Sequence, residues 1–289
     1  MYLPIKLLVT PSQKQRNHNA DKLADANTKT VFQVVNSLLN NQNKHLPTFD
    51  DPKYLATRFT RFFTNKISDI RDNLDNDPDK LDVSQFIDNC PANCGPLTGF
   101  VEMTCDEVRK VITASSNASC FLASHPTWLI KQHIDQHLPA ITAIVNKSLC
   151  SGIFSSAAHN AIVTPLIKKP SLDKEILKNY RPVSNLSYVA KVIEKCVATQ
   201  LVEHLNSNNL TDPLQSAYRA QHSTETAMIK VLSDITSDID SRRVVFVVLL
   251  DMSAAFDTVD HKILLDRLEQ SYAITGTAKA CFESYLKGS

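Results

Sequence analysis

Three aspartates follow a run of seven apolar residues late in the sequence. The run covers residues 244–250 (VVFVVLL) and precedes Asp251, Asp257 and Asp260. It is too short and too β-branched for a buried helix, so it predicts a strand covered on both faces. An isolated carboxylate is costly in an apolar interior, so Asp251 should lie at the mouth of this strand or face a cation.

A divalent cation is one such partner for Asp251. Mg²⁺ takes one or two carboxylates together with waters and substrate phosphates, an arrangement used in phosphoryl transfer. The alternative is that Asp251 only caps the turn after the strand. Asp257 and Asp260 likewise suit the start of a helix over residues 263–268, where acidic groups oppose the helix dipole. Spacing alone leaves these alternatives open.

Composition narrows the class of protein without naming a function. The chain has 289 residues, 43% of them apolar, and a formal net charge of +1, so no overall basic excess indicates nucleic acid. Seven scattered cysteines are typical of reduced thiols, and no apolar run approaches the roughly 20 residues of a membrane span. We therefore expect an intracellular protein that is not embedded in a membrane, with nucleus or cytoplasm left open.

Hydrophobic periodicity predicts several helices and one strand before the apolar run. Residues 11–30 are polar and predict a loose leader, and residues 75–96 predict a linker. Thr104 and Glu107 form a capping-box pattern, and residues 223–225 suit another helix start. Apolar stripes predict helices over 55–74, 134–149 (ending near Gly152), 189–205 and 228–239, and residues 161–169 predict an edge strand containing Pro165. These elements predict a mixed α and β class.

The segment LLDMSAAFDTVDH (249–261) closely resembles the first catalytic motif of reverse transcriptases from non-LTR (LINE-type) retrotransposons. Other segments resemble that family in the same order: PLIKK (165–169), NYRPVSNLSYVAKVIEK (179–195), LQSAYRAQHSTETA (214–227), HKILLDRL (261–268) and SYL (284–286). The resemblance implies an α+β fold, a partial right-hand polymerase with fingers and the first part of the palm, preceded by a helical region. It divides the chain into residues 1–96, between endonuclease and polymerase in the family, and residues 97–289, with the best match over 160–289.

The resemblance assigns roles around the predicted strand end. Asp251 corresponds to the first metal-binding catalytic carboxylate, and the backbone carbonyl of Met252 could help to hold a metal. Phe256 corresponds to the aromatic residue that packs beneath the incoming sugar and excludes a 2′-hydroxyl; the alternative is an ordinary core phenylalanine. Arg219 corresponds to a fingers residue that could clasp the nucleotide triphosphate; the alternative is an exposed loop arginine.

A locally basic stretch precedes these residues. It contains Lys168, Lys169, Lys174, Lys178 and Arg181. In the family this region faces the template, so the resemblance implies phosphate contacts from Lys168, Lys169, Lys178 and Arg181. Tyr180 could stack on a template base or pack against the fingers core. A charged run by itself is usually a solvated face, so that alternative also stays open.

The chain departs from the family after Asp251. No Tyr-x-Asp-Asp motif, which supplies the remaining metal-binding carboxylates, occurs in residues 252–289. We expect a reverse transcriptase-like domain truncated within the palm and inactive alone, using Mg²⁺ only if the missing motifs complete it. The intact family's partners are RNA template, DNA primer and dNTPs; the oligomeric state is open. The alternative function is a non-catalytic RNA-binding or interaction fragment. Without the rest of the palm, residues 244–250 would lack sheet partners, and poor solubility is expected.

Overall fold

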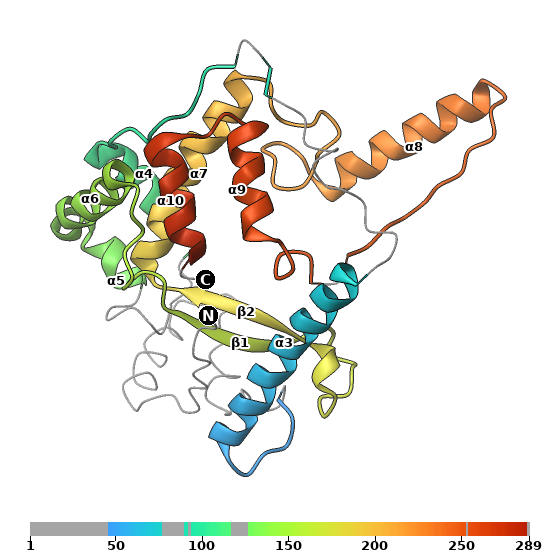
Figure 1. Ribbon diagram of the computed structural model, residues 1–289, viewed down its shortest axis with the longest axis horizontal. Coiled ribbons are helices and arrows are strands. Elements are labelled where there is room, and N and C mark those ends of the chain that lie inside the picture. Colours follow the sequence, from blue (N-terminus) through green and yellow to red (C-terminus); the bar gives the residue numbers. More distant parts are fainter. Residues whose placement is uncertain (1–45, 77–89, 92–93, 117–126, 253, 288–289) are drawn as a thin grey trace, which may run out of the picture.

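The computed structural model describes residues 46–76, 90–91, 94–116, 127–252 and 254–287. The predicted leader at 11–30 and most of the predicted linker at 75–96 lie outside the described residues. Within the described part, most helices lie to one side of a two-stranded sheet and one long helix crosses it (Figure 1). In chain order the elements are α3 (Pro52–Asp75), α4 (Cys105–Ala114), α5 (Thr127–Gln132), α6 (Ile134–Ser151), β1 (Ala161–Ile167), η3 (Leu177–Asn179), β2 (Tyr180–Leu186), α7 (Tyr188–Ser207), α8 (Thr224–Asp240), α9 (His261–Gln270) and α10 (Gly276–Lys287).

A helical body forms the larger of two hydrophobic cores. Helices α4, α6, α7 and α10 pack around one another, and their apolar stripes meet in a common cluster. Val108, Leu149 and Ile193 are completely buried there. The capping box of α4 forms as predicted, with Glu107 Oε2 accepting from the Thr104 amide at 2.7 Å. Helix α6 ends at Gly152, whose φ of 64° is the left-handed conformation common at helix ends.

The two strands form an antiparallel hairpin beneath this body. Ala161 pairs with Leu186 at one end of the ladder and Ile167 with Tyr180 at the other. Both strands are edges of the described sheet, so Pro165 fits the edge-strand prediction. The connection between the strands, residues 168–179, carries most of the basic stretch.

Helix α3 lies across this hairpin and forms a second, smaller core (Figure 1). Its first turn is stabilised by Asp51, whose side chain accepts from the Lys53 amide at 2.8 Å, and by Pro52 at the first helical position. Phe59 packs edge-on against Tyr180 with ring centroids 5.0 Å apart. The predicted division at residue 96 stays a prediction, although this core joins residues from both sides of it.

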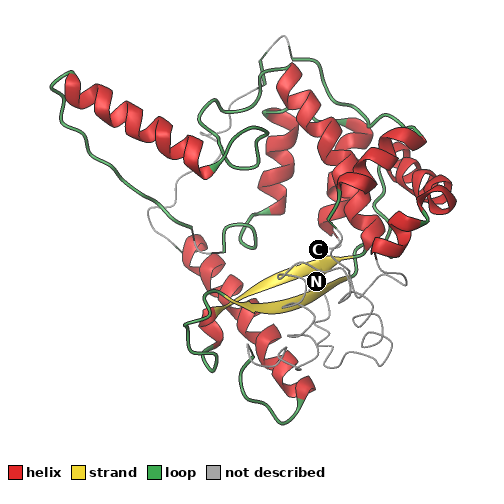
Figure 2. Ribbon diagram, turned by 180° about the vertical axis from the view of Figure 1, so that it is seen from behind, coloured by secondary structure: helices red, strands yellow, loops and turns green. Residues whose placement is uncertain are grey.

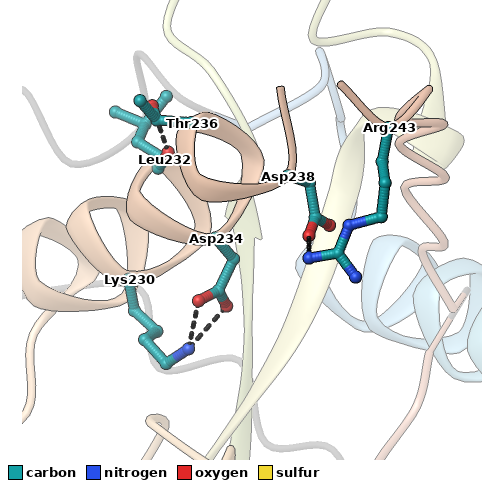
Figure 3. A network of polar contacts seen from close by, with 6 residues as sticks. All are labelled: Lys230, Leu232, Asp234, Thr236, Asp238 and Arg243. Atoms are coloured by element: carbon teal, nitrogen blue, oxygen red, sulfur yellow. Dashed lines mark hydrogen bonds and ion pairs between the residues drawn. The ribbon is translucent and has the colours of Figure 1, made fainter. Parts of the chain in front are cut away.

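Helix α8 extends away from the body, and the chain returns from its far end through residues 244–252 (Figures 1 and 2). Ser223 caps the helix as predicted, but none of its residues is buried. Its polar contacts are local: Lys230 pairs with Asp234, Thr236 Oγ1 donates to the Leu232 carbonyl, and Arg243 pairs with Asp238 at 2.6 Å (Figure 3). Such exposed ion pairs each stabilise a helix by only about 0.3–0.5 kcal/mol.

The prediction of a buried strand over residues 244–250 is wrong for this structure. The segment has no regular structure, and Phe246 and Leu250 are 88% and 91% exposed. A strand needs a neighbour to receive its backbone hydrogen bonds, and the sheet of the described residues contains only β1 and β2. The segment therefore exposes its apolar side chains, as expected for a strand without sheet partners.

The α+β class is confirmed by these helices and the small sheet. No helix among the described residues has the length and apolar character needed to cross a bilayer.

Candidate nucleotide and nucleic-acid site

Asp251 ends the exposed segment rather than a strand. Asp251 is exposed, and so is Met252, which retains 77% of its accessible surface. The carboxylate is therefore open to solvent, and it does not lie at the mouth of a strand as predicted. The sequence identified Asp251 as a candidate site residue, but it did not predict that the segment before it would be exposed and irregular.

Asp257 and Asp260 lie near the start of α9, as the alternative interpretation predicted. Asp260 caps the helix: its Oδ1 accepts from the amides of Lys262 at 2.8 Å and Ile263 at 3.0 Å. The Ile263 bond is the main reason that the pKa of Asp260 is lowered. Partial burial raises the pKa of Asp257, and the positive charge of Lys66 opposes that rise.

Phe256 and the loop that carries Arg219 are brought together. Phe256 is 77% exposed, and its ring meets the ring of Tyr218 edge-on, with centroids 6.1 Å apart. Arg219, the next residue, donates through Nη1 to the carbonyls of Asp212 at 3.3 Å and Pro213 at 3.5 Å. Phe256 is therefore not a core phenylalanine here, and Arg219 is held within its own loop. Their assigned nucleotide contacts stay predictions.

The basic stretch is solvent-facing on the β1–β2 connection and the start of β2. Lys168, Lys169, Lys178 and Arg181 are all exposed. Lys168 Nζ donates to the Lys178 carbonyl at 2.9 Å, which ties the two ends of the connection together. Exposure is compatible with both template contacts and a plain solvated face, so the template role stays a prediction.

Tyr180 occupies the second core, which corrects the prediction that its ring is available to a template base. The residue is only 3% exposed, packs against Phe59, and donates its hydroxyl to the Lys174 carbonyl at 2.9 Å. Burial, with the nearby charges of Glu175 and Asp173, raises its pKa to about 12. The packing alternative describes this side chain, although its partner is α3, which lies before the polymerase-like region.

A groove that the sequence reasoning missed lies between α3 and the β1–β2 connection. The groove is open to solvent and has a volume of about 600 Å³. We call it the α3 groove; it is lined by Arg58, Arg61, Phe62, Asn65, Lys66, Asp69, Ile70, Asn73, Leu177 and Lys178. The helical spacing of the α3 members would have placed them on one face. Their position beside Lys178 depends on the packing of Phe59 on Tyr180, which no local pattern encodes.

The carboxylates present do not fit a complete magnesium centre. Two-metal catalysis needs ligands for two cations about 3.5–4 Å apart, which a single aspartate cannot supply. Asp260 is committed to the amides of α9. Across the described ranges, no three His, Cys, Asp or Glu side chains are grouped so that they could hold a metal ion.

Comparisons with known proteins match the part of the chain that holds these residues. The family model described as reverse transcriptase (RNA-dependent DNA polymerase) matches residues 167–287. The chain is 29% identical over 126 residues to the probable RNA-directed DNA polymerase from transposon X-element of Drosophila melanogaster. The aligned residues cover 44% of this chain and 14% of that protein. It is 25% identical over 138 residues to the RNA-directed DNA polymerase from mobile element jockey of the same species, covering 48% and 15%.

Residues 167–287 are thus a reverse transcriptase-like domain. Its relatives are RNA-directed DNA polymerases of transposons, and the domain is of the non-LTR retrotransposon type, as the motif order predicted. The aligned part spans about one seventh of the length of these relatives. Helix α3 lies outside the matched residues.

Proposed function

We propose that this chain provides the fingers and the opening part of the palm of an RNA-directed DNA polymerase. Its partners are an RNA template, a DNA primer and dNTPs. The observation that carries the proposal is the family match over residues 167–287, which contains Asp251, Phe256 and Arg219. The ring contact between Tyr218 and Phe256 supports it, because it joins the two loops to which nucleotide contacts are assigned.

In this proposal each residue contributes one interaction. Asp251 and the carbonyl of Met252 provide oxygen ligands that need further carboxylates to complete a metal centre. Phe256 presents a flat ring to the sugar and disfavours a 2′-hydroxyl by exclusion. Arg219 would exchange its carbonyl partners for phosphate oxygens, which a guanidinium binds more strongly because they carry full charge.

We also propose that these 289 residues do not extend a primer by themselves. Purified protein with primer, RNA template, Mg²⁺ and dNTPs should give no product above an Asp251→Ala control, because one carboxylate cannot position two cations. A parallel reaction with an active reverse transcriptase verifies the substrates. Reproducible extension that Asp251→Ala abolishes would overturn this part of the proposal.

A further inference from the structure

Cys90 and Cys94 lie close together in the sequence and in the fold. A turn folds the chain back between them, because the amide of Cys94 donates to the carbonyl of Pro91 at 2.9 Å. Both cysteines are half-buried and carry free thiols, so a small molecule in solution can still reach them. The other described cysteines each lie on a different helix of the helical body: Cys105, Cys150, Cys196 and Cys281.

The two thiols of this pair are neighbours. Burial raises the pKa of Cys90 to about 11, and a hydrogen bond with the Cys94 thiol and the repulsion between the two sulfur charges add to that rise. The Cys94 thiol in turn donates to the carbonyl of Gly95 at 3.6 Å. A hydrogen bond between two thiols requires that they lie side by side. The sulfur atoms are therefore placed as a disulfide requires.

The backbone on both sides of the pair is anchored to the helical body. The amide of Cys90 donates to the carbonyl of Gln270 at 2.8 Å, at the last residue of α9. The amide of Gly95 donates to Asn208 Oδ1 at 3.0 Å, at the end of α7. The fold therefore holds the two thiols together in addition to their short spacing in the sequence.

The pair is better suited to a disulfide than to a metal ion. A structural zinc ion takes four ligands, mostly cysteine and histidine side chains. In the part of the chain that the structure describes, no cluster of three His, Cys, Asp or Glu residues is arranged to hold a metal. The pair thus supplies two ligands of the four, whereas a disulfide needs no third group.

From these observations we infer that Cys90 and Cys94 form a reversible disulfide, with a small-molecule disulfide such as oxidised glutathione as the oxidant. One cysteine thiolate attacks a sulfur of oxidised glutathione, and one glutathione leaves. The other cysteine thiolate then attacks the first cysteine's sulfur, and the second glutathione leaves. The cysteines lose two electrons, and their two protons pass to the glutathione thiolates. Excess reduced glutathione reverses both steps.

The first attack is assigned to Cys94. The thiolate is the attacking form of a cysteine, and a pKa of about 11 keeps Cys90 almost fully protonated at neutral pH. Cys90 therefore acts second, on a sulfur that already lies beside it. The disulfide does not depend on the proposed polymerase function, so Asp251→Ala should form it normally.

Mass spectrometry under non-reducing conditions tests the disulfide. The reduced, folded chain is equilibrated with mixtures of oxidised and reduced glutathione, the remaining thiols are blocked in acid, and the chain is cleaved after Lys80 and Glu102. The peptide of residues 81–102 contains Cys90 and Cys94 and no other cysteine. It should lose two hydrogen atoms and carry no glutathione. The same equilibration in urea gives the equilibrium constant of the unfolded chain.

The equilibrium constant for the disulfide should be about tenfold or more higher in the folded chain than in urea, because the fold already holds both ends of the turn. Cys90→Ser should instead retain one glutathione on Cys94, and Cys94→Ser should react more slowly. The matched control Cys105→Ser removes an exposed thiol at the start of α4 and should leave the constant unchanged. The comparison with urea needs no variant, so it decides the matter if circular dichroism shows that a serine variant is unfolded.

Three outcomes would overturn the inference. The first is an equal equilibrium constant in the folded chain and in urea, which would mean that the fold does not hold the pair together. The second is a folded chain that keeps glutathione on both cysteines of the peptide. The third is a pair of thiols that reacts only after a zinc chelator is added, which would mean that the cysteines bind a metal. Faster reaction of Cys94→Ser than of Cys90→Ser would overturn the assigned order of attack.

Discussion

Acidic residues that resemble catalytic groups serve here to begin helices. Asp260, within the motif that resembles the family's first catalytic segment, accepts two amide hydrogen bonds at the start of α9. Asp51 accepts one amide hydrogen bond, from Lys53, at the start of α3, and Glu107 accepts from the amide and the hydroxyl of Thr104 at the start of α4. A side chain can accept a hydrogen bond from a backbone amide within three residues of it, so local spacing predicts such a helix cap well. A metal centre needs ligands from distant segments, and the described residues contain no group of three His, Cys, Asp or Glu side chains that could hold a metal ion.

Asp260→Ala should lower the free energy of unfolding by about 1 kcal/mol, whereas Asp260→Asn should keep most of the cap. The folded pKa of Asp260 lies below its unfolded value, so its stabilisation is present above a pH of about 3.9 and is lost as pH falls through the folded pKa. Urea titrations of both variants should therefore converge on the unmodified chain in acid. An Asp260→Ala cost that stays constant down to the lowest pH would contradict this.

At the scale of elements, periodicity predicted where helices form but not which faces are covered. The stripe of α7 is buried in the helical body, with Val192, Ile193 and Cys196 at 1% exposure or less. The equally apolar stripe of α8 is exposed, including Met228 and Leu232. Residues 244–250 also expose their apolar side chains. Uncovered apolar side chains promote association in soluble proteins.

The unmodified chain should therefore self-associate, and Phe246→Lys with Val248→Lys should reduce association without lowering the melting temperature. Both side chains are at least 76% exposed, so lysine replaces few contacts. Size-exclusion chromatography with light scattering over a range of concentrations measures the effect. Thr199→Lys with Asn206→Lys adds the same charge to exposed positions of α7 as a control. A monomeric unmodified chain at all concentrations would contradict the expectation.

At the scale of the molecule, two cores of different size are joined through the hairpin. The larger core holds the helical body, and the smaller one holds α3 on β2. Tyr180 belongs to the smaller core, although sequence reasoning also offered it to a template. The α3 groove exists only because this core places α3 beside Lys178.

Phe59→Ala should release α3 while leaving the helical body folded. Deleting a buried phenylalanine costs about 3–5 kcal/mol, and Phe59 is fully buried in the smaller core alone. Hydrogen exchange should then show lost protection in α3 and β2 but not in α6 and α7. Leu149→Ala, in the larger core, should give the opposite pattern. Simultaneous loss of protection in both cores would show that they unfold as one unit.

The sequence by itself determined the positions of most of the longer helices, several of their caps and the order of the polymerase-like motifs, because hydrogen bonds within a turn and a period of 3.6 residues are local properties. Only the tertiary structure decided that residues 244–250 have no sheet partner, that Tyr180 is covered by Phe59, and that three cations of α3 face Lys178. A side chain is buried, and a strand is paired, only when another segment of the chain packs against it. Phe59, which covers Tyr180, is more than a hundred positions away from it in the sequence.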